Sequence, residues 1–189
     1  MKKIVIFASG SGSNAEKIMV HFKNNDQANI VTVFSNNLNA TVLDKAKNHQ
    51  VNTQIFKKED LYNDIILKKL NEIKPDLIVL AGFLLKLPPS IIENFPNKII
   101  NIHPALLPKY GGKGMYGINV HQSVLENKEP ESGITIHFVN EHYDEGDYIF
   151  QKSISIKDCK SAEEIAEKVL ELEHHYYKIE IEKLLISNT

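Results

Sequence analysis

The chain has 189 residues, of which 42% are hydrophobic and 24% charged, and its formal net charge is −2. These values are ordinary for a soluble globular protein, and the charge gives no electrostatic case for nucleic-acid binding. The only cysteine, Cys159, excludes an internal disulfide and has no metal-ligand spacing around it. The sequence contains no arginine, so anionic ligands must be held by backbone N–H groups, hydroxyls, amides and lysines.

The length indicates one domain, which we expect to span residues 1–189. The N-terminal residues lack the pattern of a secretory signal. No apolar run approaches the roughly 20 residues that a membrane helix requires. We therefore expect a cytoplasmic protein that binds neither membranes nor nucleic acid.

The first hundred residues alternate between two kinds of pattern. Short apolar runs predict buried strands, and apolar residues at helical spacing predict helices between them. This alternation predicts an α/β fold: a doubly wound, mostly parallel sheet with helices on both faces. The predicted strands are 4–8, 30–34, 53–56, 77–81 and 99–102, and the predicted helices are 14–24, 41–49, 59–73 and 88–95.

The pattern changes after the fifth predicted strand. Residues 110–117 include four glycines and predict a loop, which a short helix follows at 118–126. Alternating apolar and polar residues predict a half-buried strand at 134–139 and another strand at 148–156. A long helix is predicted at 161–186, with Ser161 at its start and acidic residues in its first turn.

Asn101 and His103 stand at the end of the fifth predicted strand. Residues two apart on a strand point the same way, so the amide and the imidazole would address one spot, as a developing oxyanion requires. Asp144 lies in a turn-like stretch 41 residues later, and a carboxylate beside an imidazole favours the charged ring. Taken singly, each of these residues is better explained by a structural role, as a hydrogen-bonded polar group at a strand end or as a turn former.

A loop rich in glycine and serine, residues 9–14, joins the first predicted strand to the first predicted helix. Backbone N–H groups at a helix N-terminus form a natural phosphate site, although a plain turn is an equally good interpretation. The loop lacks the Lys-Ser/Thr of a Walker loop. Open α/β sheets bind ligands beyond the carboxyl ends of their strands, so we expect Ser9, Gly82 and His103 around one crevice.

Five segments resemble the folate-dependent formyltransferases, and they occur in the order found in that family. The resemblance spans residues 4–151, with a weaker match continuing to Glu173-His174, and it implies a formyltransferase-like variant of the Rossmann fold. The segments are Ile6 to Asn14, Val33 to Asn36, Val79 to Phe83, Asn101 to Pro108 (Asn-Ile-His-Pro-Ala-Leu-Leu-Pro), and Ser132 to Val139 with its continuation to Asp144.

The resemblance implies an activity and a set of site residues. The loop Gly12-Ser13-Asn14 points to the branch of the family that acts on glycinamide ribonucleotide in purine (IMP) synthesis. 10-Formyltetrahydrofolate would be the formyl donor, used as a co-substrate, and no metal would be needed. The implied catalytic residues are Asn101, His103 and Asp144, supported by His137; the implied acceptor site is Gly12, Ser13, Asn14 and Glu173; and the implied folate site is Leu84, Leu85, Lys86, Leu87, Asn101, Asn140, Glu141, His142, Tyr143 and Asp144.

Several alternatives stay open at this point. Glu173 is as well explained by a solvated helix face, and His121 resembles a family histidine without being expected to act in catalysis. Many relatives carry an arginine where Leu85 stands, and the loop at 110–119 is longer than in some relatives. Formyltetrahydrofolate hydrolysis is disfavoured because such relatives usually have a further N-terminal domain, and formylation of initiator transfer RNA because those relatives add a basic C-terminal domain. Transfer to a nucleotide sugar is harder to exclude, a non-catalytic binding module is disfavoured by the presence of Asn101, His103 and Asp144, and a homodimer is one possible assembly.

Overall fold

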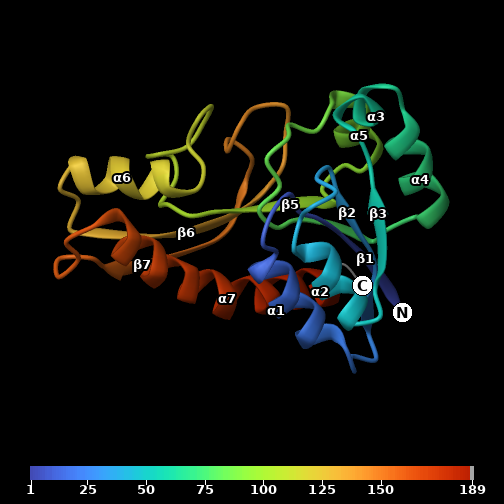
Figure 1. Cartoon of the computed structure of the whole chain (residues 1–189), viewed down its shortest axis with the longest axis horizontal. Coiled ribbons are helices and arrows are strands. Elements are labelled where there is room, and N and C mark those ends of the chain that lie inside the picture. The colour runs from blue at the N-terminus through green and yellow to red at the C-terminus, as the bar shows by residue number, and fades with distance from the viewer. Residues whose placement is uncertain (188–189) are drawn as a thin grey trace. The chain divides into compact units, whose positions relative to one another are not determined.

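The computed structural model describes residues 1–187, which form seven strands and seven helices (Figure 1). The strands belong to one sheet in the order β3-β2-β1-β4-β5-β6-β7. Most of the sheet is parallel, and the predicted fold class is confirmed. The chain divides into two compact units, Met1–Ile100 together with residues from Ile181 on, and Asn101–Glu180. The prediction of a single domain over 1–189 stays a prediction.

The first unit contains the parallel strands that the sequence predicted. Strand β1 lies between β2 and β4 and pairs in parallel with both, and its residues from Ile4 to Phe7 are fully buried. Helices α1 and α2 lie next to each other beside β2 (Figure 1). The elements are β1 (Lys2–Phe7), α1 (Ser13–Phe22), β2 (Ala28–Ser35), α2 (Val42–Asn48), β3 (Asn52–Ile55), α3 (Lys58–Tyr62), α4 (Ile65–Ile73), β4 (Leu77–Leu80), α5 (Pro89–Asn94) and the start of β5 (Ile99–His103).

The second unit is built on an antiparallel pair of strands. β6 and β7 pair over their whole length, with Thr135 opposite Gln151, and the register shifts between Ile136 and His137. In Figure 1 α6 lies on one side of this pair and α7 on the other. The elements are the end of β5, α6 (Ile118–Glu126), β6 (Glu131–Phe138), β7 (Tyr148–Ser155) and α7 (Ala162–Ser187), whose last residues belong to the first unit.

Two predicted elements differ from the structure. The helix predicted at 59–73 is two helices, α3 and α4, because Asp64 adopts a left-handed φ of 58° that ends the first helical run. The break leaves Ile65 43% exposed while Ile66 is buried, so the apolar spacing over 59–73 did not represent one continuous face.

The strand predicted as half-buried at 134–139 begins earlier, at Glu131, and is buried on both faces from Ser132 to His137. Alternation of apolar and polar residues therefore did not mark a solvent-facing side. The polar residues of this strand face other polar groups inside the second unit, as the contacts of Thr135 and His137 below show. No helix within residues 1–187 is long and apolar enough to cross a membrane.

Candidate active site

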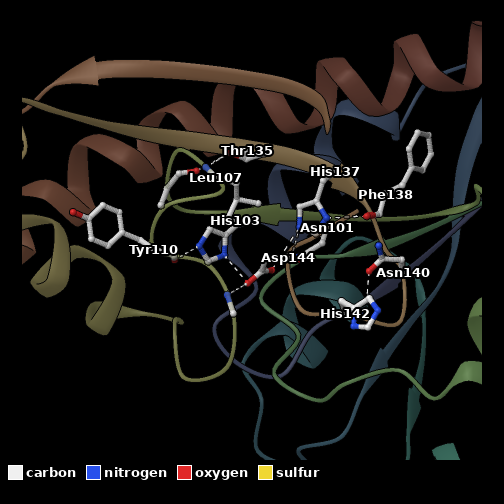
Figure 2. A network of polar contacts seen from close by, with 12 residues as sticks. Asn101, His103, Leu107, Tyr110, Thr135, His137, Phe138, Asn140, His142 and Asp144 are labelled. Carbon is white, nitrogen blue, oxygen red and sulfur yellow. Dashed lines mark hydrogen bonds and ion pairs between the residues drawn. The ribbon is translucent and has the colours of Figure 1, made fainter. Parts of the chain in front are cut away.

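The end of β5 gathers four polar side chains in the second unit (Figure 2). Two come from β5 itself, Asn101 and His103; His137 comes from β6, and Asp144 comes from the turn between β6 and β7. His103 and His137 are 3% and 2% exposed. The sequence predicted Asn101, His103 and Asp144 as one group with His137 in support, and the structure brings all four together.

His103 lies between two groups that can only accept hydrogen bonds. Its Nε2 is 2.7 Å from the backbone oxygen of Tyr110, and its Nδ1 is 3.5 Å from Oδ2 of Asp144. The short contact to a carbonyl requires a hydrogen on Nε2, so the neutral ring leaves Nδ1 unprotonated beside the carboxylate. A proton arriving at Nδ1 would therefore be stabilised by Asp144 at once.

The pKa of His103 is lowered overall. Burial is the largest influence and disfavours the charged ring, and the nearby His137 acts in the same direction, whereas Asp144 and the Tyr110 carbonyl raise the pKa. The sequence led us to expect a ring held in its cationic form by Asp144. Burial outweighs the carboxylate instead, so the ring is mostly neutral near pH 7 and is placed to accept a proton.

Asp144 is held by three different groups. Its Oδ2 accepts a hydrogen bond of 2.9 Å from the Gly112 N–H, and its Oδ1 is 3.6 Å from Nε2 of His137. Burial alone would raise the pKa of Asp144, but His137, His103 and the Gly112 N–H together bring it below its usual value. The carboxylate therefore stays charged at neutral pH although its side chain is only 12% exposed.

His137 fixes the orientation of the Asn101 amide. Nδ1 of His137 is 2.8 Å from the carbonyl oxygen of Phe138, so Nδ1 carries a hydrogen and donates to it. Nδ2 of Asn101 lies 3.3 Å from Nε2 of His137, so the amide nitrogen faces the ring. The second N–H of the same nitrogen is then left to donate elsewhere.

The loop after β5 contributes backbone groups to the site that residue types alone could not predict. Tyr110 and Asp144 both have φ of 58°, a left-handed conformation that costs a non-glycine residue about 1–2 kcal/mol. A side chain at Gly111 would meet Leu107 at 2.6 Å and Cβ of Asp144 at 3.3 Å. The glycines predicted a loop, and Gly111 and Gly112 allow the backbone of that loop to pass directly against Asp144.

The predicted phosphate loop lies in the first unit, between β1 and α1. Gly12 precedes α1 with φ of 67°, and a side chain there would collide with Val42. Ser13 begins the helix, so its N–H belongs to the positive end of the helix dipole. Glycine is thus required at position 12 by the backbone and by Val42, in addition to any role in letting a ligand approach.

The ends of β1 and β4 meet as predicted. Ser9 N–H donates to the Gly82 oxygen at 3.0 Å, and the Ser9 hydroxyl accepts from the Leu84 N–H at 3.0 Å while donating to Asn36 at 2.7 Å. The crevice that we expected to include His103 as well stays a prediction, because that residue belongs to the other unit.

The predicted folate residues divide between the two units. In the first, Leu84 and Lys86 are exposed, Leu85 is half-buried and Leu87 is 3% exposed, so Leu87 belongs to the core. In the second, Glu141, His142 and Tyr143 are exposed beside the half-buried Asn140, whose Oδ1 accepts from the His142 N–H at 2.9 Å. A single pocket formed by both sets stays a prediction.

Glu173 and His121 are both more buried than a solvated residue would be. Glu173 is 9% exposed, so the interpretation as a solvated helix face is wrong, and its contact with a ribose stays a prediction. His121, on α6, is 6% exposed, and burial, followed by the charge of His103, lowers its pKa to about 4. Within residues 1–187 no group of three His, Cys, Asp or Glu side chains is placed to hold a metal ion.

The chain is similar to one known protein family and to several solved structures. The Formyl transferase family matches residues 2–181. Among solved structures, the phosphoribosylglycinamide formyltransferase of Brucella melitensis is 36% identical with a TM-score of 0.87, and the match covers 97% of this chain and 95% of that one. Glycinamide ribonucleotide transformylase 1 of Symbiobacterium toebii has a TM-score of 0.90 at 26% identity, covering 99% and 89%.

Curated relatives agree with the solved structures. The phosphoribosylglycinamide formyltransferase of Haemophilus influenzae is 37% identical over 187 residues, which cover 96% of this chain and 86% of the relative. The chloroplastic enzyme of the same name from Arabidopsis thaliana is 37% identical over 183 residues, 93% of this chain. The matches span 63% of the Arabidopsis protein and 61% of the one from Vigna unguiculata. The chain belongs to the formyl transferase family.

Proposed function

We propose that this chain transfers the formyl group of 10-formyltetrahydrofolate to the primary amine of glycinamide ribonucleotide, a step in purine (IMP) synthesis, and that it does so in the cytoplasm. The observation that carries the proposal is the cluster of Asn101, His103, His137 and Asp144 in a chain of the formyl transferase family. A half-buried amide donor, a neutral imidazole and a charged carboxylate are groups that suit acyl transfer to an amine.

The reaction begins when the amine nitrogen attacks the formyl carbon and an oxyanion forms. The N–H of Asn101 that does not face His137 donates to this oxygen. His103, neutral because burial lowers its pKa, accepts the proton that the attacking nitrogen loses, either directly or through water. Asp144 stabilises the resulting imidazolium, whose charge in turn stabilises the oxyanion. Return of a proton to N10 of the folate releases tetrahydrofolate and the formylated amine.

The acceptor phosphate would be held by Gly12, Ser13 and Asn14. These residues form the N-terminal end of α1, a helix of 10 residues, where backbone N–H groups and the helix dipole favour an anion. The absence of arginine from the sequence supports this assignment, because no guanidinium can take the role. Glu173 would contact the ribose.

The folate would be held mainly by backbone groups and apolar side chains. Leu84, Leu85, Lys86 and Leu87 are the candidates on the segment after β4, and Asn140 to Asp144 are those on the turn before β7. Of these, Leu87 is buried in the core, so it supports the pocket rather than facing solvent. A homodimer remains compatible with this function and is not required by it.

The proposal is tested by supplying 10-formyltetrahydrofolate with and without an amine acceptor. We expect rapid release of tetrahydrofolate only when glycinamide ribonucleotide is present, with formylated acceptor formed in equal amount. Proximity of the bound amine to the formyl carbon is what allows it to compete with water. An amino-sugar nucleotide should be a poor acceptor in the same assay.

Three outcomes would contradict the proposal. Fast release of formate without acceptor would identify a hydrolase that uses the same residues. Turnover only with an amino-sugar nucleotide would identify a sugar formyltransferase. Tight folate binding with no turnover on any acceptor would identify a binding module.

A further inference from the structure

The turn that follows His103 is held by two side chains from the β6–β7 pair. The Thr135 hydroxyl donates to the Ala105 oxygen at 2.7 Å and accepts from the Leu107 N–H at 3.0 Å. Nε2 of Gln151 donates to the Leu107 oxygen at 2.9 Å and to the Thr135 hydroxyl at 2.9 Å. Three hydrogen bonds thus join the backbone of residues 105–107 to Thr135 and Gln151, and a fourth joins these two side chains to each other.

This network has one consistent arrangement of hydrogens. A hydroxyl has one hydrogen and two lone pairs, and Thr135 uses all three. Gln151 uses both hydrogens of its amide nitrogen, and the reversed amide would place its oxygen against the Leu107 oxygen. Gln151 therefore acts as a donor, and an acceptor at the same place would be repelled.

The turn at residues 105–107 lies in the chain between His103 and Tyr110, which contact each other. Residues 105–107 connect His103 to Tyr110, and Nε2 of His103 is bonded to the Tyr110 oxygen. Thr135 also lies two residues before His137 on β6, so both side chains project from the same face of that strand. On the same face of β6, Thr135 bonds to the turn and His137 contacts Asn101 and Asp144.

Open space borders part of this segment. A cavity of about 290 Å³ borders residues 106–110, with Val124 and Glu129 among its other lining residues. A segment with open space on one side loses part of its packing contacts there, so its position depends more on hydrogen bonds. Gln151 is exposed on β7 and belongs to none of the residues that would touch substrate.

We infer that Gln151, acting through Thr135 and the turn at residues 105–107, is a positioning residue that sets the place of the His103 ring and its bond to Tyr110. The inference rests on the proposed function for its effect on turnover, and on the geometry of the second unit alone for its effect on His103. The bond to the Tyr110 oxygen favours the protonated His103 ring. Loss of Gln151 loosens the turn and weakens this bond, so His103 becomes harder to protonate and its pKa falls.

The test is a series of substitutions that differ in their hydrogen-bond donors. Gln151→Met keeps length and removes the donors, Gln151→Glu offers only acceptors, and Gln151→Lys keeps a donor. Gln54→Met is the matched control, because Gln54 lies on the other edge strand, β3, and its amide also donates to a backbone oxygen. Each variant is assayed for kcat, KM, the pH profile of kcat, thermal midpoint and the NMR titration of His103.

We expect Gln151→Met to lower kcat about 10-fold and Gln151→Glu to lower it further, with both KM values within about twofold of the parent protein, since a misplaced catalytic group costs rate rather than binding. The His103 titration and the acidic limb of the kcat profile should both move to lower pH. Gln151→Lys should largely restore both readouts, and Gln54→Met should change neither.

An unchanged His103 titration in Gln151→Met and Gln151→Glu would overturn the inference, whatever the thermal midpoints. Equal losses in the methionine and lysine variants would also overturn it, because donors would then be irrelevant. The titration needs no substrate, so it decides the inference even if the parent protein proves inactive in formyl transfer. That second result would contradict only the proposed function.

Discussion

The segments after β1 and after β5 both follow buried strands, but they are built in different ways. The loop at residues 9–14 offers backbone groups at a helix N-terminus, and its shape depends on Gly12 and its neighbour Val42. The segment after β5 is part of a cluster of side chains whose members come from β5, β6 and the turn at Asp144. The groups that the first site offers to a ligand are consecutive in sequence, whereas those of the second come from residues more than thirty positions apart.

This difference indicates which region should bind the substrate and which should carry out the chemistry. A backbone site presents fixed dipoles and does not titrate, so it suits a phosphate that stays unchanged during a reaction. The cluster after β5 contains a histidine whose pKa is set by opposing influences, so it suits proton transfer. Substitutions in the cluster should therefore change turnover, and substitutions in the loop should change acceptor binding.

The largest expected effect is the loss of the oxyanion donor Asn101 or of the proton acceptor His103. We predict that Asn101→Ala lowers kcat by about 10²- to 10³-fold, the scale for removing one oxyanion donor, and that His103→Ala lowers it by about 10²- to 10⁴-fold, the scale for removing a general base. Acceptor and folate binding, measured by calorimetry, should change little. Near-parental turnover in both variants would remove the cluster from the catalytic account.

Asp144→Asn should lower kcat about 10-fold or more and shift a titration. The carboxylate raises the pKa of His103 against the effect of burial, so the neutral amide should let that pKa fall further. The acidic limb of the kcat profile, which follows deprotonation of His103, should move to lower pH. If NMR gives the same His103 titration in the variant and the parent, Asp144 is only a turn residue.

His121 should make folding stability depend on pH. Its pKa is about 4 in the folded chain and near 6.5 in an unfolded one. Between these values the unfolded chain binds a proton that the folded chain does not, so the free energy of unfolding falls as pH falls. The loss should be about 2–3 kcal/mol by pH 4.5.

Urea unfolding between pH 7 and pH 4.5 measures the contribution of His121. The His121→Leu variant should show a flatter dependence on pH than the parent, whereas His175→Gln, at an exposed position, should leave the dependence unchanged. Equal slopes in the parent and His121→Leu would show that the imidazole is charged or hydrated in the folded chain.

The smallest effect is expected from the loop after β1. Ser13→Ala should raise the KM for the acceptor roughly 10-fold, the low end for a hydrogen bond to a charged group, while kcat and the folate KM stay near parental values. Ser11→Ala, in the same loop, is the control. Gly12 is a poor choice for this test, because any side chain there collides with Val42. A fall in kcat without a change in acceptor KM would show that the loop does not hold the acceptor.

Local sequence patterns predicted elements well in both units. The strand predicted at 77–81 is observed at Leu77–Leu80, and the helix predicted at 118–126 is observed at Ile118–Glu126. The helix predicted at 59–73 failed at Asp64, where one left-handed residue interrupts a spacing that otherwise looks continuous.

The candidate site, too, could be predicted only where a sequence pattern or a family resemblance pointed to a residue. Asn101 and His103 could be paired from strand periodicity, and Asp144 and His137 from the resemblance to a family. The bond from His103 to the Tyr110 oxygen, the N–H of Gly112 on Asp144 and the role of Gln151 involve backbone atoms or tertiary register. Residue types alone carry no signal for such contacts. The balance between burial and Asp144 at His103 also depends on packing, and it reversed the expected direction of the pKa.

The central claim is that the cluster after β5 moves a formyl group from folate to an amine. The most direct measurement follows the carbon itself, using 10-formyltetrahydrofolate labelled with ¹³C in the formyl group together with glycinamide ribonucleotide. NMR should show the label leaving the folate and appearing as the formyl amide of the acceptor with the parent protein, and remaining on the folate with His103→Ala. Label appearing as formate, or moving to the acceptor equally fast with His103→Ala, would contradict the account.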